Sequence, residues 1–201
     1  MLPINIDLGR VRVALVGDGD RARRRLALLD EAGAIALDVY APAPTSELAE
    51  AAGARLRRRW PASDEIARAQ LVFVAEAPEA ICGAICRVAR AAGVLINVED
   101  DRDHSLFHSA AVIRRGDLTI GVSTGGRSPG LAALIRQMLD RQIGHEWEWR
   151  LAEIGALRKA WRAAGAAPGA IGRLTRDWAL SRGWFDAPRP EASQGPQHPV
   201  G

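Results

Sequence analysis

The sequence has little cysteine and no long apolar run. Two cysteines among 201 residues cannot build the disulfide framework of a small secreted domain, and Cys82 and Cys86, four apart in an apolar helical stretch, are expected to be buried thiols. No segment reaches the ~18 consecutive apolar residues of a membrane-spanning helix. No basic region followed by an apolar run marks a signal peptide at the N-terminus. We therefore expect a cytoplasmic protein that has no membrane partner.

Aromatic residues are also scarce, and this disfavours binding to nucleic acid. They make up 5% of the chain, and six of the ten are tryptophan. Arginine dominates the positive charge, with clusters around Arg21 and over residues 57–59, yet the net charge is only +3. A nucleic-acid-binding face would be denser in basic residues and interleaved with aromatics. We expect no nucleic-acid partner, while an anionic small molecule and an ordinary solvated surface explain the arginines equally well.

The first half of the chain alternates strand patterns with helical patterns. Strands are predicted at 11–16, 35–40, 54–60, 71–75 and 94–98, and helices at 20–32, 45–52, 63–68 and 78–92. Strands and helices that alternate at this spacing predict parallel βαβ units. The fold class is therefore α/β, with an N-terminal Rossmann-like parallel sheet.

The pattern changes after about residue 109. Two strands are predicted, one before and one after a turn at 115–117. Ser128 and Pro129 then begin a long helix. More helix is predicted over 146–164. Residues 186–201 are rich in Pro, Gly and Gln, which is typical of a disordered tail.

A glycine-containing turn, GDGDRA at residues 17–22, follows the first strand and opens the first helix. Glycines at such a turn allow a pyrophosphate to approach the backbone at the helix N-terminus, which is how dinucleotides are bound. A purely structural tight turn is the alternative. Asp18 counts against the dinucleotide because it brings a carboxylate into a loop meant for an anion. The choice between NAD and NADP stays open, since no acidic residue ends the second strand.

Polar residues crowd the end of the fifth predicted strand, where the chain reads NVEDDRDH over residues 97–104. Ligands of open α/β sheets collect at the carboxyl edge of the strands. Carboxylates such as Asp100 at that edge can act as general acids or bases. A solvated polar loop explains the same residues equally well.

Two histidines, His104 and His108, stand four apart close to Asp100 and Asp103. On a helical turn this spacing can clamp a metal ion. Two surface histidines are the alternative, and the spacing alone favours them.

A third polar segment, STGGRSP at residues 123–129, precedes the long helix. Small hydroxyl residues and glycines before a helix can form a nest of backbone N–H groups that binds an anion. The alternative is an ordinary helix N-cap, with Thr124 or Ser128 satisfying backbone donors. Both interpretations can hold together.

Taken in this order, these segments resemble the dehydrogenase–chelatase part of siroheme synthase, the precorrin-2 dehydrogenase/sirohydrochlorin ferrochelatase family. The opening MLPI with VGDGD at 16–20 is similar to the family's start, as is LDEAGA at 29–34. NVED at 97–100 resembles the family's Asn-Val-x-Asp, and STGGRSPGL at 123–131 is the most distinctive match. The resemblance spans residues 1 to about 162.

The resemblance implies a division of the chain and a site. The domains would be a Rossmann-like dinucleotide-binding domain at 1–108, a dimerisation region at 109–145 and a helical domain at 146–185, followed by the tail at 186–201. Asp100 would be the acid/base residue of both the dehydrogenation and the metal insertion. The NAD site would comprise Gly17, Gly19, Asp20, Arg21, Ala22, Pro42 and Ala43. The tetrapyrrole site would comprise Asn97, Thr124, Gly125, Gly126 and Ser128. The protein would be a homodimer, and the divalent metal (iron, or else cobalt or nickel) would be a substrate. A chelatase must hold its metal beside the base, which strengthens the interpretation of His104 and His108 as metal ligands against the surface alternative.

The activity implied is the NAD-dependent oxidation of precorrin-2 to sirohydrochlorin in siroheme biosynthesis, with ferrochelatase activity as a second reaction. One alternative is a diverged tetrapyrrole metallochelatase that lacks the redox step. Another is a nucleotide- or metal-binding module without turnover. Asp100 at the strand edge favours an enzyme, whereas Asp18 and Glu76 in the cofactor cleft favour the alternatives.

Overall fold

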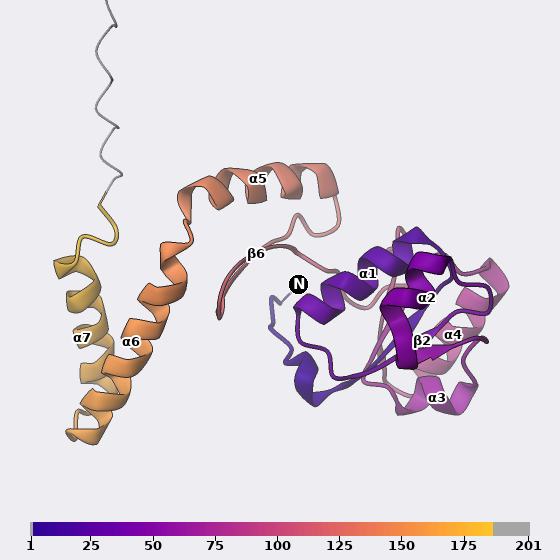
Figure 1. The fold of residues 1–201 in the computed structure, drawn as a ribbon, viewed down its shortest axis with the longest axis horizontal. Helices are drawn as coiled ribbons and strands as arrows, with labels where there is room; N and C mark the ends of the chain where they lie inside the picture. The colour runs from indigo at the N-terminus through magenta and orange to yellow at the C-terminus, as the bar shows by residue number, and fades with distance from the viewer. Residues whose placement is uncertain (1, 187–201) are drawn as a thin grey trace, which may run out of the picture. The chain divides into compact units, whose positions relative to one another are not determined.

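The computed structural model describes residues 2–186, so nearly all of the predicted tail at 186–201 lies outside the described residues. The chain divides into two compact units (Figure 1). Unit 1 comprises Met1–Ala111 and Val122–Ala133, and unit 2 comprises Val112–Gly121 and Leu134–Gly201.

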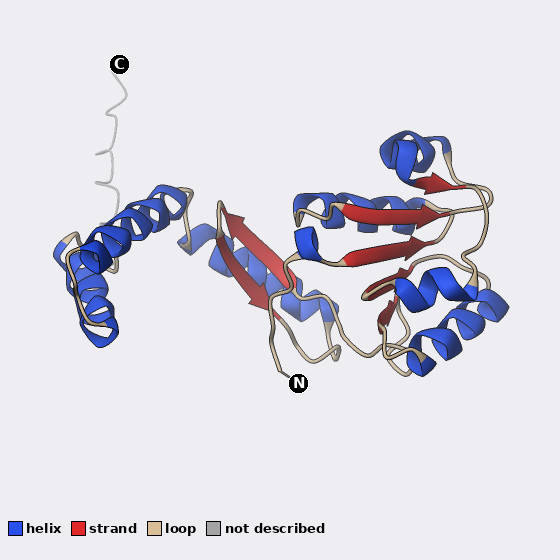
Figure 2. Ribbon diagram, turned by 90° about the horizontal axis from the view of Figure 1, so that it is seen from below, coloured by secondary structure: helices blue, strands red, loops and turns tan. Residues whose placement is uncertain are grey.

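Unit 1 is built on a five-stranded parallel sheet, whose strands are drawn red in Figure 2. The strands are β1 (Arg12–Val16), β2 (Ala36–Tyr40), β3 (Leu56–Arg57), β4 (Leu71–Val74) and β5 (Leu95–Val98). Their order in the sheet is β3-β2-β1-β4-β5, and every neighbouring pair is parallel. This is the strand order of a doubly wound fold, so the predicted Rossmann-like sheet is confirmed.

Helices cover both faces of this sheet. They are α1 (Asp20–Glu31), α2 (Ser46–Ala52), α3 (Ser63–Arg68) and α4 (Glu79–Ala91). On one face Leu15 packs in a buried cluster with Leu26 of α1, and on the other Val16 packs with Ile85 of α4. Burial on both sides explains why β1 and β4 read as continuous apolar runs rather than alternating ones.

The third strand is shorter than the sequence predicts. The prediction covered residues 54–60, but β3 contains only Leu56 and Arg57, after a 3-10 turn at Gly53–Arg55. This strand lies at the edge of the sheet, where charged residues are tolerated and continued pairing is not enforced by burial. Arg57 instead forms an ion pair with Asp38 at 2.8 Å. The other predicted elements of unit 1 begin and end within one residue of the observed bounds.

After β5, the residues up to 186 contain a two-stranded antiparallel hairpin and three helices. These elements are β6 (Ala111–Arg115), β7 (Leu118–Val122), α5 (Pro129–Gln142), α6 (Glu146–Ala163) and α7 (Pro168–Ser181). Helices α6 and α7 pack against each other (Figure 1), and Arg182 after α7 pairs with Glu153 of α6 at 3.1 Å. Among the described residues, no helix is both long enough and apolar enough to cross a membrane.

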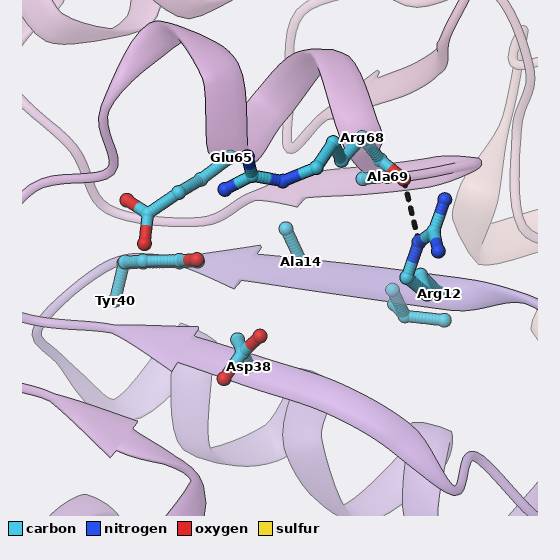
Figure 3. Close-up of a pocket in the computed structure, with 8 residues that line it drawn as sticks. Arg12, Ala14, Asp38, Tyr40, Glu65, Arg68 and Ala69 are labelled. Atoms are coloured by element: carbon cyan, nitrogen blue, oxygen red, sulfur yellow. Dashed lines mark hydrogen bonds between the residues drawn. The ribbon is translucent and has the colours of Figure 1, made fainter.

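A small cavity of about 110 Å³ lies between α3 and the sheet in unit 1 (Figure 3). Its polar lining is Arg12, Asp38, Tyr40, Glu65 and Arg68. Arg12 closes one side by donating a 2.8 Å hydrogen bond from Nε to the carbonyl oxygen of Arg68. None of the predicted site residues lines this cavity, so it is separate from the predicted cofactor and substrate sites.

The Glu65 carboxylate beside this cavity makes the stability of unit 1 depend on acid pH. Hydrogen bonds from Arg59, 2.6 Å to each carboxylate oxygen, hold the pKa of Glu65 at about 2, below its ordinary value of 4.5. A lowered pKa stabilises the native state above pH 4.5, and this contribution is lost as the pH falls towards 2. We expect Glu65→Gln to lower the free energy of unfolding at pH 7 by about 1 kcal/mol, a value reduced for solvent screening.

Urea unfolding of wild type and Glu65→Gln between pH 7 and pH 2 measures this effect. The stability difference between the two proteins is expected to shrink as the pH falls. Asp64→Asn is the matched control, because Asp64 lies on the same helix in an exposed pair with Arg68. A constant difference across the pH range would contradict the assignment.

Candidate functional site

The turn after β1 requires glycine at its first position. Gly17 has φ 149°, and a Cβ atom there would lie 1.5 Å from the carbonyl oxygen of Ala75. Its N–H donates to the carbonyl oxygen of Tyr40 at 3.0 Å. The chain order of the sheet reverses between β1 and β4, so this turn lies at the switch point where doubly wound sheets bind ligands.

The Asp18 carboxylate is bonded within the protein. Its Oδ1 accepts a hydrogen bond from the N–H of Ala43 at 3.0 Å, and its carbonyl oxygen accepts one from the N–H of Thr45 at 3.0 Å. These two bonds tie the glycine turn to the loop after β2 that contains Pro42. Asp18 therefore has a structural role that the sequence did not reveal.

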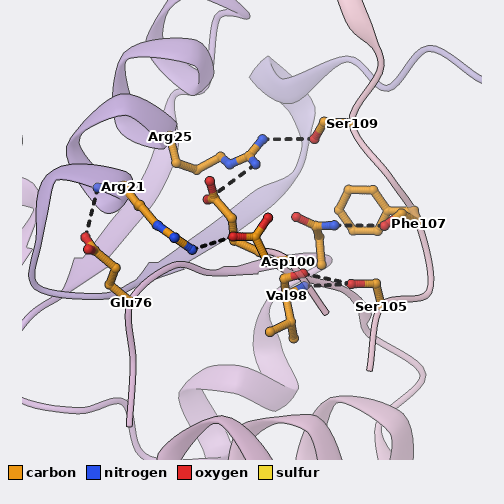
Figure 4. A network of polar contacts seen from close by, with 10 residues as sticks. Arg21, Arg25, Glu76, Val98, Asp100, Ser105, Phe107 and Ser109 are labelled. Carbon is orange, nitrogen blue, oxygen red and sulfur yellow. Dashed lines mark hydrogen bonds and ion pairs between the residues drawn. The ribbon is translucent and has the colours of Figure 1, made fainter. Parts of the chain in front are cut away.

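A different carboxylate, that of Glu76, lies at the start of α1. Its Oε2 accepts a hydrogen bond from the N–H of Arg21 at 2.9 Å (Figure 4). A Cβ atom on Gly19 would lie 2.2 Å from the same oxygen. The first turn of a helix that follows such a strand is where a phosphate binds. Glu76 thus occupies the anion position of the turn.

Asp100 follows β5 and is held from α1. Its Oδ2 accepts a charge-assisted hydrogen bond from Nη1 of Arg21 at 2.6 Å (Figure 4). The side chain of Asp100 is 76% exposed, so it is open to a ligand. Its φ of 61° lies in the left-handed region, which Asp tolerates better than most residues. The structure therefore brings the predicted acid/base residue beside the predicted cofactor turn.

A second arginine, one turn further along α1, faces the neighbouring carboxylate. Arg25 lies 3.6 Å from Glu99, and its Nη1 donates to Oγ of Ser109 at 2.9 Å. Its guanidinium also lies over the ring of Phe73, and the side chain is only 14% exposed. The sequence interpretation missed these pairs. The signal was present, since Arg21 and Arg25 have the i, i+4 spacing of one helix face.

The two histidines predicted as metal ligands lie in different surroundings. His104 donates its backbone N–H to Oδ1 of Asp101 at 3.0 Å, and its Nδ1 lies 2.6 Å from Oδ2. These hydrogen bonds lower the pKa of Asp101. His108 is half-buried in the following loop. Over residues 2–186 there is no group of three or more His, Cys, Asp and Glu side chains that could hold a metal ion.

Asn97, predicted to bind substrate, is 7% exposed at the end of β5. Its Nδ2 donates to the carbonyl oxygen of Phe107 at 2.9 Å, and the Phe107 ring packs edge-on against Phe73. Asn97 therefore fixes the loop that carries Asp100 and returns past the sheet.

The segment at 123–128 caps helix α5 and lies beside the loop that follows Asp100. Oγ1 of Thr124 accepts the N–H of Ser128 at 3.1 Å, and Oγ of Ser128 accepts the N–H of Leu131 at 3.2 Å. Arg102 joins the two segments by donating from Nη2 to the carbonyl oxygen of Gly125 at 3.2 Å. The hydroxyl groups thus have the capping role that the sequence offered as one of two interpretations.

Two family models match the chain. Residues 4–111 match a family described as "Putative NAD(P)-binding", and residues 115–142 match one described as "Sirohaem biosynthesis protein central". The chain belongs to the siroheme synthase N-terminal family. The resemblance inferred from the sequence motifs is thereby confirmed.

Relatives of this family cover most of the chain. The siroheme synthase of Tolumonas auensis is 33% identical over an alignment of 183 residues, which covers 83% of this chain and 39% of that protein. The siroheme synthase of Chromobacterium violaceum is 36% identical over 157 residues, 77% of this chain and 33% of that protein. The chain thus spans about two fifths, or less, of the length of these relatives.

A solved structure confirms the fold of this family member. The chain is similar to SirC, a precorrin-2 dehydrogenase, with a TM-score of 0.71 and 20% sequence identity over 93% of each chain. At that level of identity the similarity concerns the fold alone.

Proposed function

We propose that this protein catalyses the NAD-dependent oxidation of precorrin-2 to sirohydrochlorin. Membership of the siroheme synthase N-terminal family, with its NAD(P)-binding domain, supports the proposal. The observation that carries it is the exposed Asp100 carboxylate, held by Arg21 2.6 Å away in the first turn of the helix that the glycine turn opens. A base and a dinucleotide turn at one sheet edge are what the removal of a hydride and a proton requires.

The residues of the glycine turn fit a dinucleotide once the side chain of Glu76 moves away from the N-terminus of α1. The backbone at Gly17, Gly19, Asp20 and Ala22 offers a pyrophosphate the N-terminus of α1, and Pro42 and Ala43 line the neighbouring loop. Glu76 now occupies this position, but it is exposed and bound there through one hydrogen bond to a backbone N–H, so its side chain can rotate away.

In the proposed reaction the macrocycle loses one hydride and one proton. Bound NAD⁺ supplies the hydride acceptor. Asp100 takes up the proton, for which its exposed carboxylate is suited. The segment with Thr124, Ser128 and the two left-handed glycines, Gly125 and Gly126, binds the tetrapyrrole, because the glycines allow close approach of its backbone. Asn97 holds the Asp100 loop in place.

Incubation of the purified chain with precorrin-2 and NAD⁺ tests this function. The absorbance of NADH and of sirohydrochlorin should rise together, with one NADH formed per molecule oxidised. NADP⁺ in a parallel reaction decides the cofactor. A folded protein that binds sirohydrochlorin but forms no NADH would favour the metallochelatase without redox activity, and one that binds neither ligand would favour the non-catalytic module.

Metal insertion into sirohydrochlorin is the second reaction that we propose for this site. The four macrocycle nitrogens would hold the divalent metal, and the protein would need to accept the protons that they release. Two protons are released, and the exposed carboxylate of Asp100 can accept them one at a time and pass each to solvent. Insertion of iron, cobalt and nickel by wild type, Asp100→Asn and the His104→Ala/His108→Ala double variant tests both roles. Equal rates in wild type and the histidine variant would remove the histidines as metal ligands.

We also propose that the protein is a homodimer that associates through residues 109–145. Helix α5 in this region exposes three large apolar side chains at helical spacing, namely Leu131, Leu134 and Met138. Exposed apolar residues on one helix face are typical of an interface between proteins. Sedimentation of the purified chain tests this, and a monomer at every concentration would contradict it.

Removal of the Glu76 charge is expected to strengthen dinucleotide binding. Its carboxylate and a pyrophosphate would compete for the first turn of α1 and repel each other. Glu76→Gln should lower the Kd for NAD by about tenfold, equivalent to ~1.4 kcal/mol. Calorimetric titration with NAD⁺ measures this. Glu79→Gln is the control, because Glu79 is an exposed carboxylate three residues away in the first turn of α4. Equal affinity in wild type and Glu76→Gln would show that Glu76 does not compete.

A further inference from the structure

The first two turns of α1 carry two arginines that face two successive carboxylates after β5. Arg21 meets Asp100 at 2.6 Å, and Arg25 meets Glu99 at 3.6 Å. The two pairs differ in burial. Arg25 is almost covered, whereas Arg21 and Asp100 are both open to solvent. The covered Arg25–Glu99 pair therefore anchors α1 to the end of β5. The exposed Arg21–Asp100 pair is open to a bound substrate.

We propose that Arg21 is the positioning residue that holds the Asp100 carboxylate beside the glycine turn. This inference rests on the proposed function, because it assumes that Asp100 is the base. Among the described residues, Arg21 is the one whose side chain contacts the Asp100 carboxylate. An exposed carboxylate without such a partner would sample several rotamers. The bond to Arg21 selects one of them.

Arg21 can do this because its own backbone is fixed. It lies in the first turn of α1, and one turn later Arg25 is held by Glu99, Ser109 and the Phe73 ring. The guanidinium thus reaches Asp100 from a rigid part of α1. An exposed ion pair contributes little to stability, so the pair acts through the position of the carboxylate.

A competing role for the Arg21 side chain is direct contact with a dinucleotide phosphate. The two roles predict different kinetics. A positioning residue affects kcat and leaves dinucleotide affinity unchanged, whereas a phosphate contact affects dinucleotide affinity. Misplacing a reacting group by about 1 Å can reduce a rate by about 10²-fold.

The test compares Arg21→Gln, Arg21→Lys and the control Arg24→Gln. Arg24 lies on the same helix and pairs with Asp20. In Arg24→Gln, Asp20 still has its ion pair with Arg23. We expect Arg21→Gln to lower kcat by about 10–100-fold with the Kd for NAD⁺ unchanged. Arg21→Lys should restore part of the rate, and Arg24→Gln should behave as wild type. In the background of Asp100→Asn, Arg21→Gln should cause no further loss, because both changes act on one carboxylate.

A crystal structure of Arg21→Gln supplies a readout that does not depend on turnover. The Asp100 carboxylate should be ordered in wild type and disordered in the variant, with the main chain at 99–101 unchanged. Weaker NAD⁺ binding with unchanged kcat, or an Asp100 rotamer that is the same in both proteins, would overturn the positioning role alone. An inert wild type would overturn the proposed function, and with it any role of the ion pair in catalysis.

Discussion

Asp100→Asn is expected to lower kcat for precorrin-2 oxidation by about 10²–10⁴-fold, the range that a general base contributes. The amide has nearly the same volume as the carboxylate but cannot take up a proton. Asn also tolerates the left-handed φ of 61° at this position, and its oxygen can still accept the bond from Arg21. Because the side chain is 76% exposed, the fold should be unaffected.

NADH formation under saturating substrate measures the effect, and urea unfolding checks the fold. Asp103→Asn is the control, since Asp103 is an exposed carboxylate on the same loop. Wild-type turnover by Asp100→Asn, with the control also active, would remove Asp100 from the mechanism. Loss of metal insertion in the same variant would assign both reactions to one carboxylate.

Gly17→Ala is expected to destabilise the protein by at least ~4 kcal/mol or to prevent folding. The new Cβ atom would lie 1.5 Å from the backbone carbonyl oxygen of Ala75, and φ at this residue is 149°. Neither the new Cβ atom nor the carbonyl oxygen can move aside by a side-chain rotation. Relief of the clash would require β1 and β4 to separate at the end of their pairing, next to Val16 and Val74. Both of these valines are buried in the core.

Gly19→Ala distinguishes this steric effect from a general intolerance of the turn. The three atoms nearest to a Cβ atom on Gly19 would all belong to the carboxylate end of Glu76, which can rotate, and φ is −106°. Its free energy of unfolding should change by less than ~1 kcal/mol. The stability of the two variants is measured by urea unfolding. A wild-type transition midpoint for Gly17→Ala would contradict the close approach of the two strands.

The two carboxylates of the cofactor turn, Asp18 and Glu76, have different roles that the sequence did not distinguish. Both Asp18 and Glu76 were identified as negative charges in the cleft. The structure separates their roles, because Asp18 is bonded to the N–H of Ala43, whereas Glu76 lies at the N-terminus of α1. Sequence distance could not distinguish them, since the partner of Asp18 is 25 residues away and that of Glu76 is 55 residues away.

The sequence by itself determined the α/β fold and the residues gathered at the carboxyl edge of the sheet. Runs such as RVALV and LVFV are strands because apolar, β-branched residues fit a sheet buried on both faces. The order of strands and helices then brings Gly17 and Asp100 to the same edge, since parallel strands end together. These patterns are local, so they can be read along the chain.

Only the tertiary structure decided how those residues contact one another. Arg21 and Asp100 are 79 residues apart, and Arg25 and Ser109 are 84 apart. Such pairs depend on strand order and on the register of α1 against β5, and no local pattern encodes either. The length of the edge strand β3 also could not be predicted from a local pattern. It ends at Arg57 because its pairing with β2 ends there. Local propensity selects the elements, whereas the choice of partner is made by burial across the whole sheet.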